Sequence, residues 1–334
     1  MTSVHDTGEH AMKAIVIRET GGPEVLRYES VSVGAPGPDE IKLRQTAINV
    51  NFHDTYVRTG LYKTLKLPGI PGLDAVGVVE VVGSAVKHLK VGDRVAYITQ
   101  AYGAYAEARL IAADRVLPVP DDVDDRTAAA TLLRGMTVWM LLSKVHALKA
   151  GEVYLVHAAG GGVGRLLCQW ATHLGAHVIG TAGNEQKAAL GLQSGCKEVI
   201  LYRQENFAAR TRDLTKGRGV AAVFDSVGKD TFSGSLECLA IRGHLINFGQ
   251  SSGPVEPFAV SRLAEKSNTL SRPLLFHYIE DQAERSEMAD QVFKALRSGV
   301  IVADIGPQFA LRDAAQAHRA LEMRSNTGST ILIP

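Results

Sequence analysis

Cysteine is scarce in this sequence, and charge of neither sign accumulates. Three cysteines are scattered over 334 residues, at Cys168, Cys196 and Cys238, which excludes a disulfide framework or a clustered metal motif and fits a reducing compartment. Lysine and arginine total 36 against 35 for aspartate and glutamate, with no basic run of the kind that binds nucleic acid or an acidic membrane surface.

Long apolar runs are also missing. No uninterrupted apolar stretch approaches the roughly 20 residues that span a bilayer. The first 11 residues are polar, where a signal peptide would be apolar. We therefore expect a soluble cytoplasmic protein that binds neither membrane nor nucleic acid.

The chain is long enough for two domains, with 46% of its residues hydrophobic. From residue 13 to about 115, short apolar runs are broken by glycine and proline, and no helical spacing interrupts them. Strands are predicted at residues 14–17, 41–44, 75–82 and 94–97. This part is expected to form a β-barrel-like domain.

From Leu148 the pattern alternates between strands and helices. Strands are predicted at residues 153–157, 177–180, 198–202, 220–225 and 244–248, and helices at 163–174 and 185–194. Such alternation predicts an α/β fold with a parallel, doubly wound sheet. Two amphipathic helices (284–297 and 312–324) and a strand (329–333) follow, and we expect this last strand to return to the first domain.

A glycine-rich turn connects the strand at 153–157 to the next helix. In the sequence Ala158-Ala159-Gly160-Gly161-Gly162-Val163-Gly164, Gly161 and Gly164 take the second and third glycine places of the dinucleotide fingerprint, and Ala159 takes the first. Backbone N–H groups and the positive end of a helix can there meet a diphosphate. A flexible turn is the alternative, but the strand before, the helix after and the following βα units favour nucleotide binding.

The tip of the second strand favours NADP over NAD. Residues 181–184 read Thr-Ala-Gly-Asn, without the acid that usually holds the ribose hydroxyls of NAD. Lys187 lies just beyond this tip, and Tyr202 ends the next predicted strand. Glu185 would favour NAD if it turned inward. Taken alone, Lys187 fits a phosphate ligand and a solvated helix lysine equally well.

At these residues the chain resembles the zinc-independent quinone oxidoreductases of the zeta-crystallin type, in the medium-chain dehydrogenase/reductase superfamily, from Met12 to Pro334. The matching stretches, in chain order, are residues 21–26, 51–56, 60–62, 92–95, 135–137, 157–164, 225–228 and 329–334. The resemblance implies a GroES-like catalytic domain split between 12–134 and 272–334, a Rossmann domain at 135–271, NADPH as cofactor, and a homodimer.

The resemblance also implies which residues contact NADPH. These are Asn51, Tyr56, Gly160, Gly161, Gly162, Val163, Gly183, Lys187, Tyr202, Phe248, Gly249, Ser271, Arg272, Pro273 and Arg324. Of these, Lys187, Tyr202 and Arg324 would hold the 2′-phosphate. The chain departs from the family pattern at Arg134, where lysine is usual, and at Trp139 and Met140, where other aromatic residues are common, so the choice of substrate stays open.

The sequence argues against a catalytic metal. Zinc-containing relatives use an early cysteine and a Gly-His-Glu segment, whereas residues 72–77 here read Gly-Leu-Asp-Ala-Val-Gly and no cysteine precedes Cys168. His53 and Asp54 alone do not make a site. Hydride transfer to an electrophilic, conjugated acceptor remains feasible, and Asn51, Tyr56 and Tyr62 are the candidate catalytic donors to the acceptor oxygen.

We therefore predict an NADPH-dependent quinone oxidoreductase acting on quinones or related conjugated carbonyls. One alternative is a 2-alkenal or enoyl reductase on the same fold. Another is a non-enzymatic, crystallin-like NADPH-binding protein, for which RNA binding is disfavoured by the balanced charge. Cys168 and Cys238 are expected to be core thiols, and His157 a satisfied structural histidine.

Overall fold

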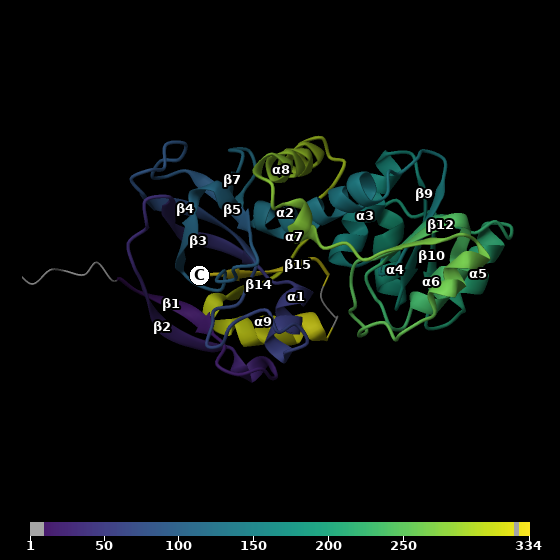
Figure 1. Cartoon of the computed structure of the whole chain (residues 1–334), viewed down its shortest axis with the longest axis horizontal. Coiled ribbons are helices and arrows are strands. Elements are labelled where there is room, and N and C mark those ends of the chain that lie inside the picture. The colour runs from purple at the N-terminus through teal and green to yellow at the C-terminus, as the bar shows by residue number, and fades with distance from the viewer. Residues whose placement is uncertain (1–9, 324–326) are drawn as a thin grey trace, which may run out of the picture. The chain divides into compact units, whose positions relative to one another are not determined.

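A computed structural model of the chain describes residues 10–323 and 327–334, and it divides into two compact units (Figure 1). Unit 1 comprises the chain up to Leu133 and from Ala303 onward, and unit 2 comprises Arg134–Val302. The first boundary lies one residue from the predicted one. The second lies elsewhere, because residues 272–302, predicted to belong to the split domain, are part of unit 2.

Unit 1 is rich in β-strands, as the broken apolar pattern predicted; its strands pair antiparallel except for the last two along the chain, which are parallel to each other. The strands are β1 (His10–Val16), β2 (Arg27–Val33), β3 (Glu40–Asn49), β4 (Asp74–Val82), β5 (Arg94–Ile98), β6 (Ala108–Ala112), β7 (Val116–Pro118), β14 (Ile305–Ala310) and β15 (Ser329–Ile333). One sheet has the order β14-β15-β3-β4-β5-β7, with β6 also paired to β3. The C-terminal strand does return to this unit, since Ile331 of β15 pairs with Asn49 of β3.

A helix that the sequence reading missed interrupts this β-rich region. Helix α1 (Phe52–Thr59) follows β3 directly. Its N-cap is Asn51, whose backbone N–H donates to the Asp54 carboxylate over 2.8 Å, and Gly60 ends it in the left-handed region with φ of 82°. The Asn51-x-x-Asp54 spacing is the sequence signal that could have predicted this helix. Helix α9 (Ala314–Glu322) lies within the range predicted for it.

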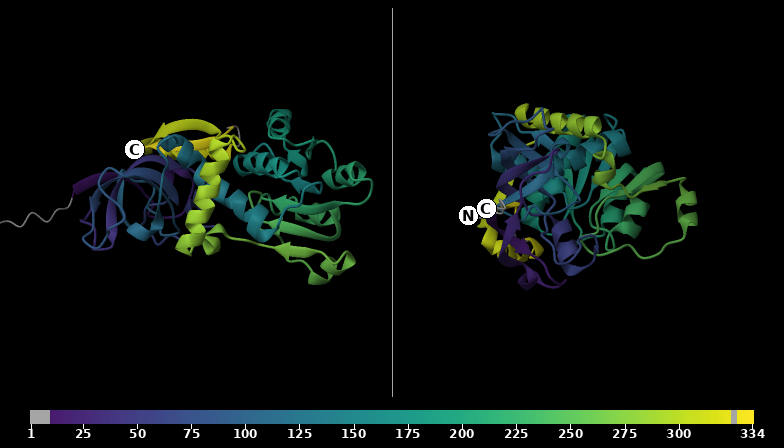
Figure 2. Two further views of the ribbon diagram at one scale, coloured as in Figure 1. Left: turned by 90° about the horizontal axis from the view of Figure 1, so that it is seen from above. Right: turned by 60° about the vertical axis from the view of Figure 1, so that its left-hand side comes forward.

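Unit 2 confirms the doubly wound prediction. Its six strands are β8 (Val153–Val156), β9 (His177–Ala182), β10 (Glu198–Leu201), β11 (Val220–Asp225), β12 (Leu239–Asn247) and β13 (Thr269–Ser271). They run parallel in the order β10-β9-β8-β11-β12-β13. Figure 2 shows these strands in teal and green, with helices packed along them.

The helices of unit 2 cover the sheet in two groups. Helices α3 (Gly162–His173) and α4 (Glu185–Gln193) contact β8, β9 and β10, whereas α5 (Phe207–Leu214) and α6 (Phe232–Cys238) contact β10, β11 and β12. The chain leaves β8 toward one edge of the sheet and β11 toward the other. The neighbouring strands β8 and β11 therefore form the topological switch point, outside whose carboxyl ends ligands bind in such sheets.

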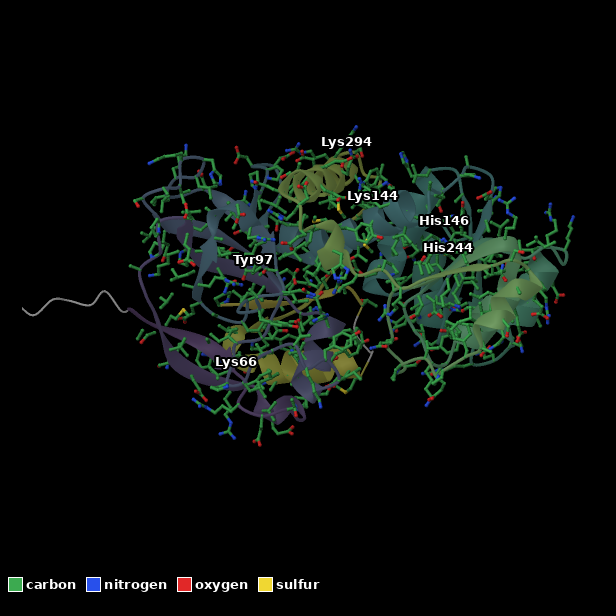
Figure 3. All side chains as sticks on the ribbon, in the orientation of Figure 1. Lys66, Tyr97, Lys144, His146, His244 and Lys294 are labelled. Atoms are coloured by element: carbon green, nitrogen blue, oxygen red, sulfur yellow. The ribbon has the colours of Figure 1, made fainter. Side chains whose placement is uncertain are left out.

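Close packing explains why residues 272–302 belong to unit 2. Helix α8 (Gln282–Arg297) buries Met288, Val292 and Phe293. Gly135 belongs to helix α2 (Asp125–Trp139). Val292 lies 2.7 Å from where a Cβ on Gly135 would stand, so the absence of a side chain there allows α2 to approach α8. Lys144, labelled in Figure 3, forms ion pairs of 3.4 Å with Glu284 and Glu287 of the same helix.

Candidate functional site

The predicted nucleotide contacts of unit 2 lie at one edge of its sheet. The loop Gly160–Val163 follows the end of β8, Gly183 follows β9, Tyr202 follows β10, Phe248 and Gly249 follow β12, and Ser271 ends β13, directly before Arg272 and Pro273. Because all six strands are parallel, their carboxyl ends meet at the same edge. Positions spread over more than a hundred residues of sequence thus lie along one edge of the sheet, on both sides of the switch point.

At three of the loop glycines another part of the protein lies where a side chain would begin, and at Gly160 and Gly164 this neighbour is backbone, which requires glycine. A Cβ on Gly160 would stand 2.3 Å from the Lys187 carbonyl oxygen, and a Cβ on Gly164 would stand 2.2 Å from that of Ala158. At Gly162 the same atom would meet the Arg134 guanidinium at 2.5 Å. These contacts hold the loop against α4, β8 and α2 (Asp125–Trp139).

Gly161 differs from the other three. Its Cβ would approach the Ala158 carbonyl oxygen at 3.1 Å, and the rest of the described chain beyond its sequence neighbours stays more than 3.4 Å away. Gly161 is the N-cap of α3 with φ of −89° and ψ of 171°, a conformation open to any residue. The position is more open than the other three and lies at the positive end of a helix, a place that favours anions.

A second group of polar side chains lies at the tips of β9 and β10. The Tyr202 hydroxyl lies 2.9 Å, and the Arg203 Nε 3.6 Å, from where a Cβ on Gly183 would stand. Lys187 is in the first turn of α4, where its backbone N–H donates to the Asn184 side chain over 2.9 Å. Sequence reasoning missed Arg203, although it directly follows Tyr202.

Two residues that bear on the choice between NADP and NAD remain. Arg324 lies outside the described residues. Glu185, the residue that could favour NAD, begins α4 with its side chain exposed.

Some predicted contacts use their side chains within the protein. The Ser271 hydroxyl is bonded to His244 Nε2 over 2.6 Å, and Arg272 donates to the Asn247 carbonyl over 3.0 Å. The backbone N–H groups of Phe248 and Gly249 both donate to the Asp225 carbonyl, at 2.8 and 3.3 Å. The side chains of Ser271 and Arg272 are thus used within the protein, and Phe248 and Gly249 are fixed to the sheet edge by their backbone.

His157, directly before the loop, is held by hydrogen bonds at both ring nitrogens. Its Nδ1 lies 2.9 Å from Thr181 Oγ1 and its Nε2 lies 2.9 Å from Ser235 Oγ. Burial lowers its pKa, so the ring is neutral and joins the ends of β8 and β9 to α6. This arrangement agrees with the interpretation of His157 as a structural residue.

Asn51, in unit 1, is held from two sides. Its Nδ2 donates to Asp74 Oδ1 over 2.7 Å, and its Oδ1 accepts from Asn49 Nδ2 over 2.9 Å. The side chain is 8% exposed. Asp74 lies in the segment where zinc-containing relatives place ligands, and here its carboxylate fixes two amides.

Tyr56 and Tyr62 belong to an aromatic cluster beside Asn51. Their rings meet edge to face with centroids 5.1 Å apart, and Tyr62 makes a similar contact of 5.1 Å with His53. His53 Nε2 lies 3.1 Å from the Tyr102 hydroxyl, which also bonds to Thr64. Burial lowers the pKa of His53 to about 4, so the cluster is uncharged at neutral pH. Sequence reasoning did not select Tyr102.

A buried polar chain anchors α1 to α9. Arg58 Nη1 lies 3.1 Å from His318 Nδ1, His318 Nε2 lies 3.0 Å from the Tyr105 hydroxyl, and that hydroxyl donates to Asp54 Oδ2 over 3.1 Å. Since a guanidinium only donates, His318 accepts at Nδ1 and carries its proton at Nε2. Burial raises the pKa of Asp54 to about 7 and, with the charge of Arg58, lowers that of His318 to about 3.

The cysteines are less scattered in space than in sequence. Cys196 donates to Cys168 with their sulfur atoms 3.3 Å apart, and both are buried.

The arrangement of potential metal ligands bears on the question of a catalytic metal. Among the residues that the structure describes, no group of three or more His, Cys, Asp or Glu side chains is placed to hold a metal ion. His146 and His244, labelled in Figure 3, approach at 3.3 Å between their Nδ1 atoms but form only a pair. Nor is any helix of the described residues long and apolar enough to cross a bilayer.

Comparison with known proteins assigns both halves of the chain. Residues 37–121 match the model of the alcohol dehydrogenase GroES-like domain, and residues 162–306 match that of the zinc-binding dehydrogenases. This pair of domains, with the doubly wound sheet and its glycine loop, defines a medium-chain dehydrogenase/reductase.

The relatives narrow the class further. The chain is 45% identical to a quinone oxidoreductase of Pseudomonas aeruginosa and 43% identical to quinone oxidoreductase 1 of Escherichia coli, covering 96% of this chain and 99% of each relative. It therefore belongs to the quinone oxidoreductases. A 2-haloacrylate reductase of a Burkholderia species is 41% identical over 96% of this chain and 98% of its own length.

Solved structures agree with this assignment. The Escherichia coli quinone oxidoreductase complexed with NADPH superposes with a TM-score of 0.93 at 43% identity, covering 96% of this chain and all of that one. The Pseudomonas syringae enzyme gives a TM-score of 0.94 at 44% identity, covering 97% of this chain and 100% of the other.

Proposed function

We propose that this protein is an NADPH-dependent quinone oxidoreductase that reduces quinones or related conjugated carbonyls without a metal. The observation that carries the proposal is the convergence of the glycine loop, Gly183 and Tyr202 at the carboxyl edge of the unit 2 sheet. It is supported by the relatives named quinone oxidoreductase and by the NADPH bound to the Escherichia coli enzyme.

In this proposal the residues of unit 2 bind the nucleotide. Backbone N–H groups of Gly160–Val163 bind the diphosphate, while Lys187 and Tyr202, together with Arg324 from the C-terminal part of the chain, hold the 2′-phosphate. The residues after β12 and β13 border the nicotinamide half through their backbone. Bound NADPH supplies the hydride.

The residues of unit 1 orient the reacting groups. The hydrogen bonds from Asn49 and to Asp74 keep the Asn51 amide in one orientation. A fixed amide suits a contact with the reacting groups, because it need not reorient during the reaction. Tyr56 contacts the nucleotide, and the hydroxyls of Tyr56 and Tyr62 donate to the acceptor oxygen as negative charge develops there. The neutral His53 stabilises the tyrosine arrangement without adding charge.

A second activity, reduction of an activated alkene, is favoured by one observation. The 2-haloacrylate reductase is nearly as similar to this chain as the quinone oxidoreductases are. Both reactions need the same nucleotide site, and they differ in the acceptor, a quinone in one and in the other an activated alkene that takes the hydride at its β-carbon. A non-enzymatic, crystallin-like role is the remaining alternative.

One experiment separates these functions. NADPH oxidation is followed at 340 nm with a panel of quinones, 2-alkenals, haloacrylates and enoyl thioesters. We expect the highest kcat/KM with a quinone. A higher value for an alkene substrate would transfer the assignment to the second activity, and no turnover together with tight NADPH binding would support the non-enzymatic role.

We also propose that the enzyme is a cytoplasmic homodimer. The resemblance supports the dimer, and so does β13, which ends the sheet order and pairs with β12 among the described strands. Ile241 is 77% exposed on the neighbouring β12. Light scattering coupled to size exclusion should give twice the chain mass of 35.8 kDa, and a monomer would contradict the proposal.

A further inference from the structure

The aromatic cluster of unit 1 needs a supply of protons if it serves the proposed reaction. Conversion of a quinone, NADPH and one proton into a hydroquinone and NADP⁺ takes the second hydrogen of the product from outside the nucleotide. Tyr56 and Tyr62, the proposed donors to the acceptor oxygen, are half-buried. A tyrosine that gives up its proton must regain one before the next turnover, which requires a path from water.

A chain of side-chain contacts leads from an exposed residue into this cluster. Thr64 is exposed, and its hydroxyl is hydrogen-bonded to the Tyr102 hydroxyl. Tyr102 is 4% exposed, and its hydroxyl lies 3.1 Å from His53 Nε2. The His53 ring meets the Tyr62 ring edge to face, with their centroids 5.1 Å apart. The chain therefore extends from an exposed hydroxyl to a ring that packs against a proposed donor.

Each group in this chain can pass a proton without keeping a charge. A hydroxyl both donates and accepts, and a neutral imidazole donates at one nitrogen and accepts at the other. Burial lowers the pKa of His53 to about 4, so its ring is neutral at neutral pH. Burial raises the pKa of Tyr102, and so do the nearby Asp54 and Tyr62, so the Tyr102 hydroxyl keeps its proton. Protons can thus move along the chain only by passing from one neutral group to the next.

The backbone at Tyr102 has a conformation that suits this role. Its φ is 52°, in the left-handed region that a bulky residue seldom adopts. Gly103 follows with φ of 95° and donates its N–H to the Ile70 carbonyl over 2.9 Å. Strain of this kind persists only where the surroundings enforce it, and it clusters at functional sites. Here it accompanies a hydroxyl that is bonded to both Thr64 and His53.

We propose that Thr64, Tyr102 and His53 form a proton relay that recharges Tyr62. When the acceptor takes a proton from Tyr62, His53 gives its ring proton to Tyr62 and takes one at Nε2 from Tyr102. Tyr102 then takes a proton from Thr64, and Thr64 takes one from water. Every O–H or N–H bond that breaks is replaced on the same residue, so no group is left charged. Only Tyr62 contacts the acceptor, and the proposal rests on the proposed quinone reduction.

Tyr102→Phe breaks the relay and keeps the ring. With a quinone whose hydroquinone is protonated at neutral pH, we expect kcat to fall about tenfold or more, while the quinone KM and the NADPH dissociation constant stay within about twofold of the parent. The solvent deuterium isotope effect on kcat should rise, because proton supply becomes rate-limiting. A quinone with strongly electron-withdrawing substituents gives a hydroquinone that is ionised at neutral pH, so its reduction needs no relay and should keep the parental kcat.

Two further variants test the neighbours of Tyr102. His53→Gln should show the same dependence on the quinone, because an amide hydrogen-bonds but does not transfer a proton between its two ends; it also serves where Tyr102→Phe does not fold. Thr64→Val should lower kcat less, since water can replace an exposed hydroxyl, and Thr64→Ser should recover the lost rate. Tyr28→Phe, at an exposed tyrosine of β2, is the matched control and should leave kcat unchanged with both quinones.

The two quinones separate a relay from a packing role. Equal losses of kcat with both quinones, or a loss without a change in the solvent isotope effect, would make Tyr102 a packing residue. Parental kcat with both quinones in Tyr102→Phe and His53→Gln would show that the proton takes another route. Each of these results overturns the relay. A parent enzyme that reduces neither quinone would instead overturn the proposed function.

Discussion

The two units carry their candidate residues in different ways. In unit 2 the proposed nucleotide contacts belong to a loop and strand ends, where backbone groups and missing side chains decide the geometry. In unit 1 the candidate residues are side chains on and beside α1, a helix that Arg58 ties to His318, far away in the sequence. Nucleotide binding therefore follows from local sequence, whereas the chemistry of the acceptor site depends on long-range packing.

The largest effect should come from the open position of the loop. Gly161→Val is expected to lower NADPH affinity by at least about a hundredfold, because its side chain would fill the space of the diphosphate. Its φ of −89° removes backbone strain as an explanation. Melting temperature without cofactor and NADPH fluorescence are measured together.

The matched control for this change is Gly34→Val in unit 1. A Cβ at Gly34 meets none of the described residues within 4 Å, so both binding and stability should stay at parental values. A Gly161→Val protein that folds and binds NADPH normally would show that the nucleotide lies elsewhere.

The tyrosine cluster should give the next largest effect. Tyr56→Phe and Tyr62→Phe are each expected to lower kcat with a quinone by about tenfold to a hundredfold, because each removes one donor to the developing charge. Tyr28→Phe, on a residue 41% exposed in β2, serves as the control. Parental kcat in both cluster variants would restrict the two hydroxyls to packing and nucleotide contact.

Nucleotide preference should respond at the strand tips. The parent is expected to prefer NADPH over NADH by at least about tenfold, since a charge-assisted contact contributes about 1.5–3 kcal/mol. Lys187→Met should remove most of this preference by weakening NADPH alone. Equal catalytic efficiencies of the parent with the two nucleotides would contradict the assignment of the 2′-phosphate contacts.

The buried chain of unit 1 should produce a smaller, pH-dependent effect. The pKa of His318 falls from 6.5 to about 3 on folding, so the native state binds fewer protons than the unfolded state between these values. Its contribution to stability is complete above pH 6.5 and is lost as the pH falls toward 3. Asp54, whose pKa is raised to about 7, acts with the opposite sign and is common to parent and variant.

His318→Gln isolates this contribution, because an amide can accept from Arg58 and donate to Tyr105 without titrating. Between pH 7.5 and 5, the melting temperature of the parent should fall a few degrees more than that of the variant. Parallel melting curves over this range would show that His318 does not titrate as described.

Removal of metal ions is expected to have no effect on the enzyme. Treatment with a chelator should leave activity and melting temperature unchanged, and elemental analysis should find no stoichiometric zinc, because residues 72–77 lack the ligands of the zinc-containing relatives. One zinc per chain in the active protein would overturn this expectation.

Much of the fold could be predicted from periodicity. Strands β8 to β11 and helices α3 and α4 lie within a few residues of their predicted bounds, because buried parallel strands and amphipathic helices leave strong local patterns. Strand β12 begins five residues before its predicted start, and the three-residue β13 was not predicted. Helix α1 was missed because its eight residues are too few for a period to show, although its capping pair was visible. Residues 272–302 lie in unit 2, and the packing of Val292 on Gly135 within it is a long-range contact that no local pattern reports.

The site divides in the same way. The loop and strand tips were named because a motif and a strand end are local. Tyr102, His318 and the pairing of Cys168 with Cys196 were not, because no local pattern links residues so far apart in the sequence. Arg134 was noticed as a departure from the family, but its contact with Gly162 emerges only from the packing of two helices.

The crowding of the loop glycines has a practical consequence for redesign of the enzyme. At Gly160 and Gly164 backbone atoms already occupy the space of a side chain, so these two positions offer no freedom for engineering, and at Gly162 a side chain would have to displace the Arg134 guanidinium. The half-buried Lys187 and the exposed Arg203, at the strand tips, can be exchanged without repacking a core. A change of reductant from NADPH to NADH should therefore be sought there, with the loop left as it is.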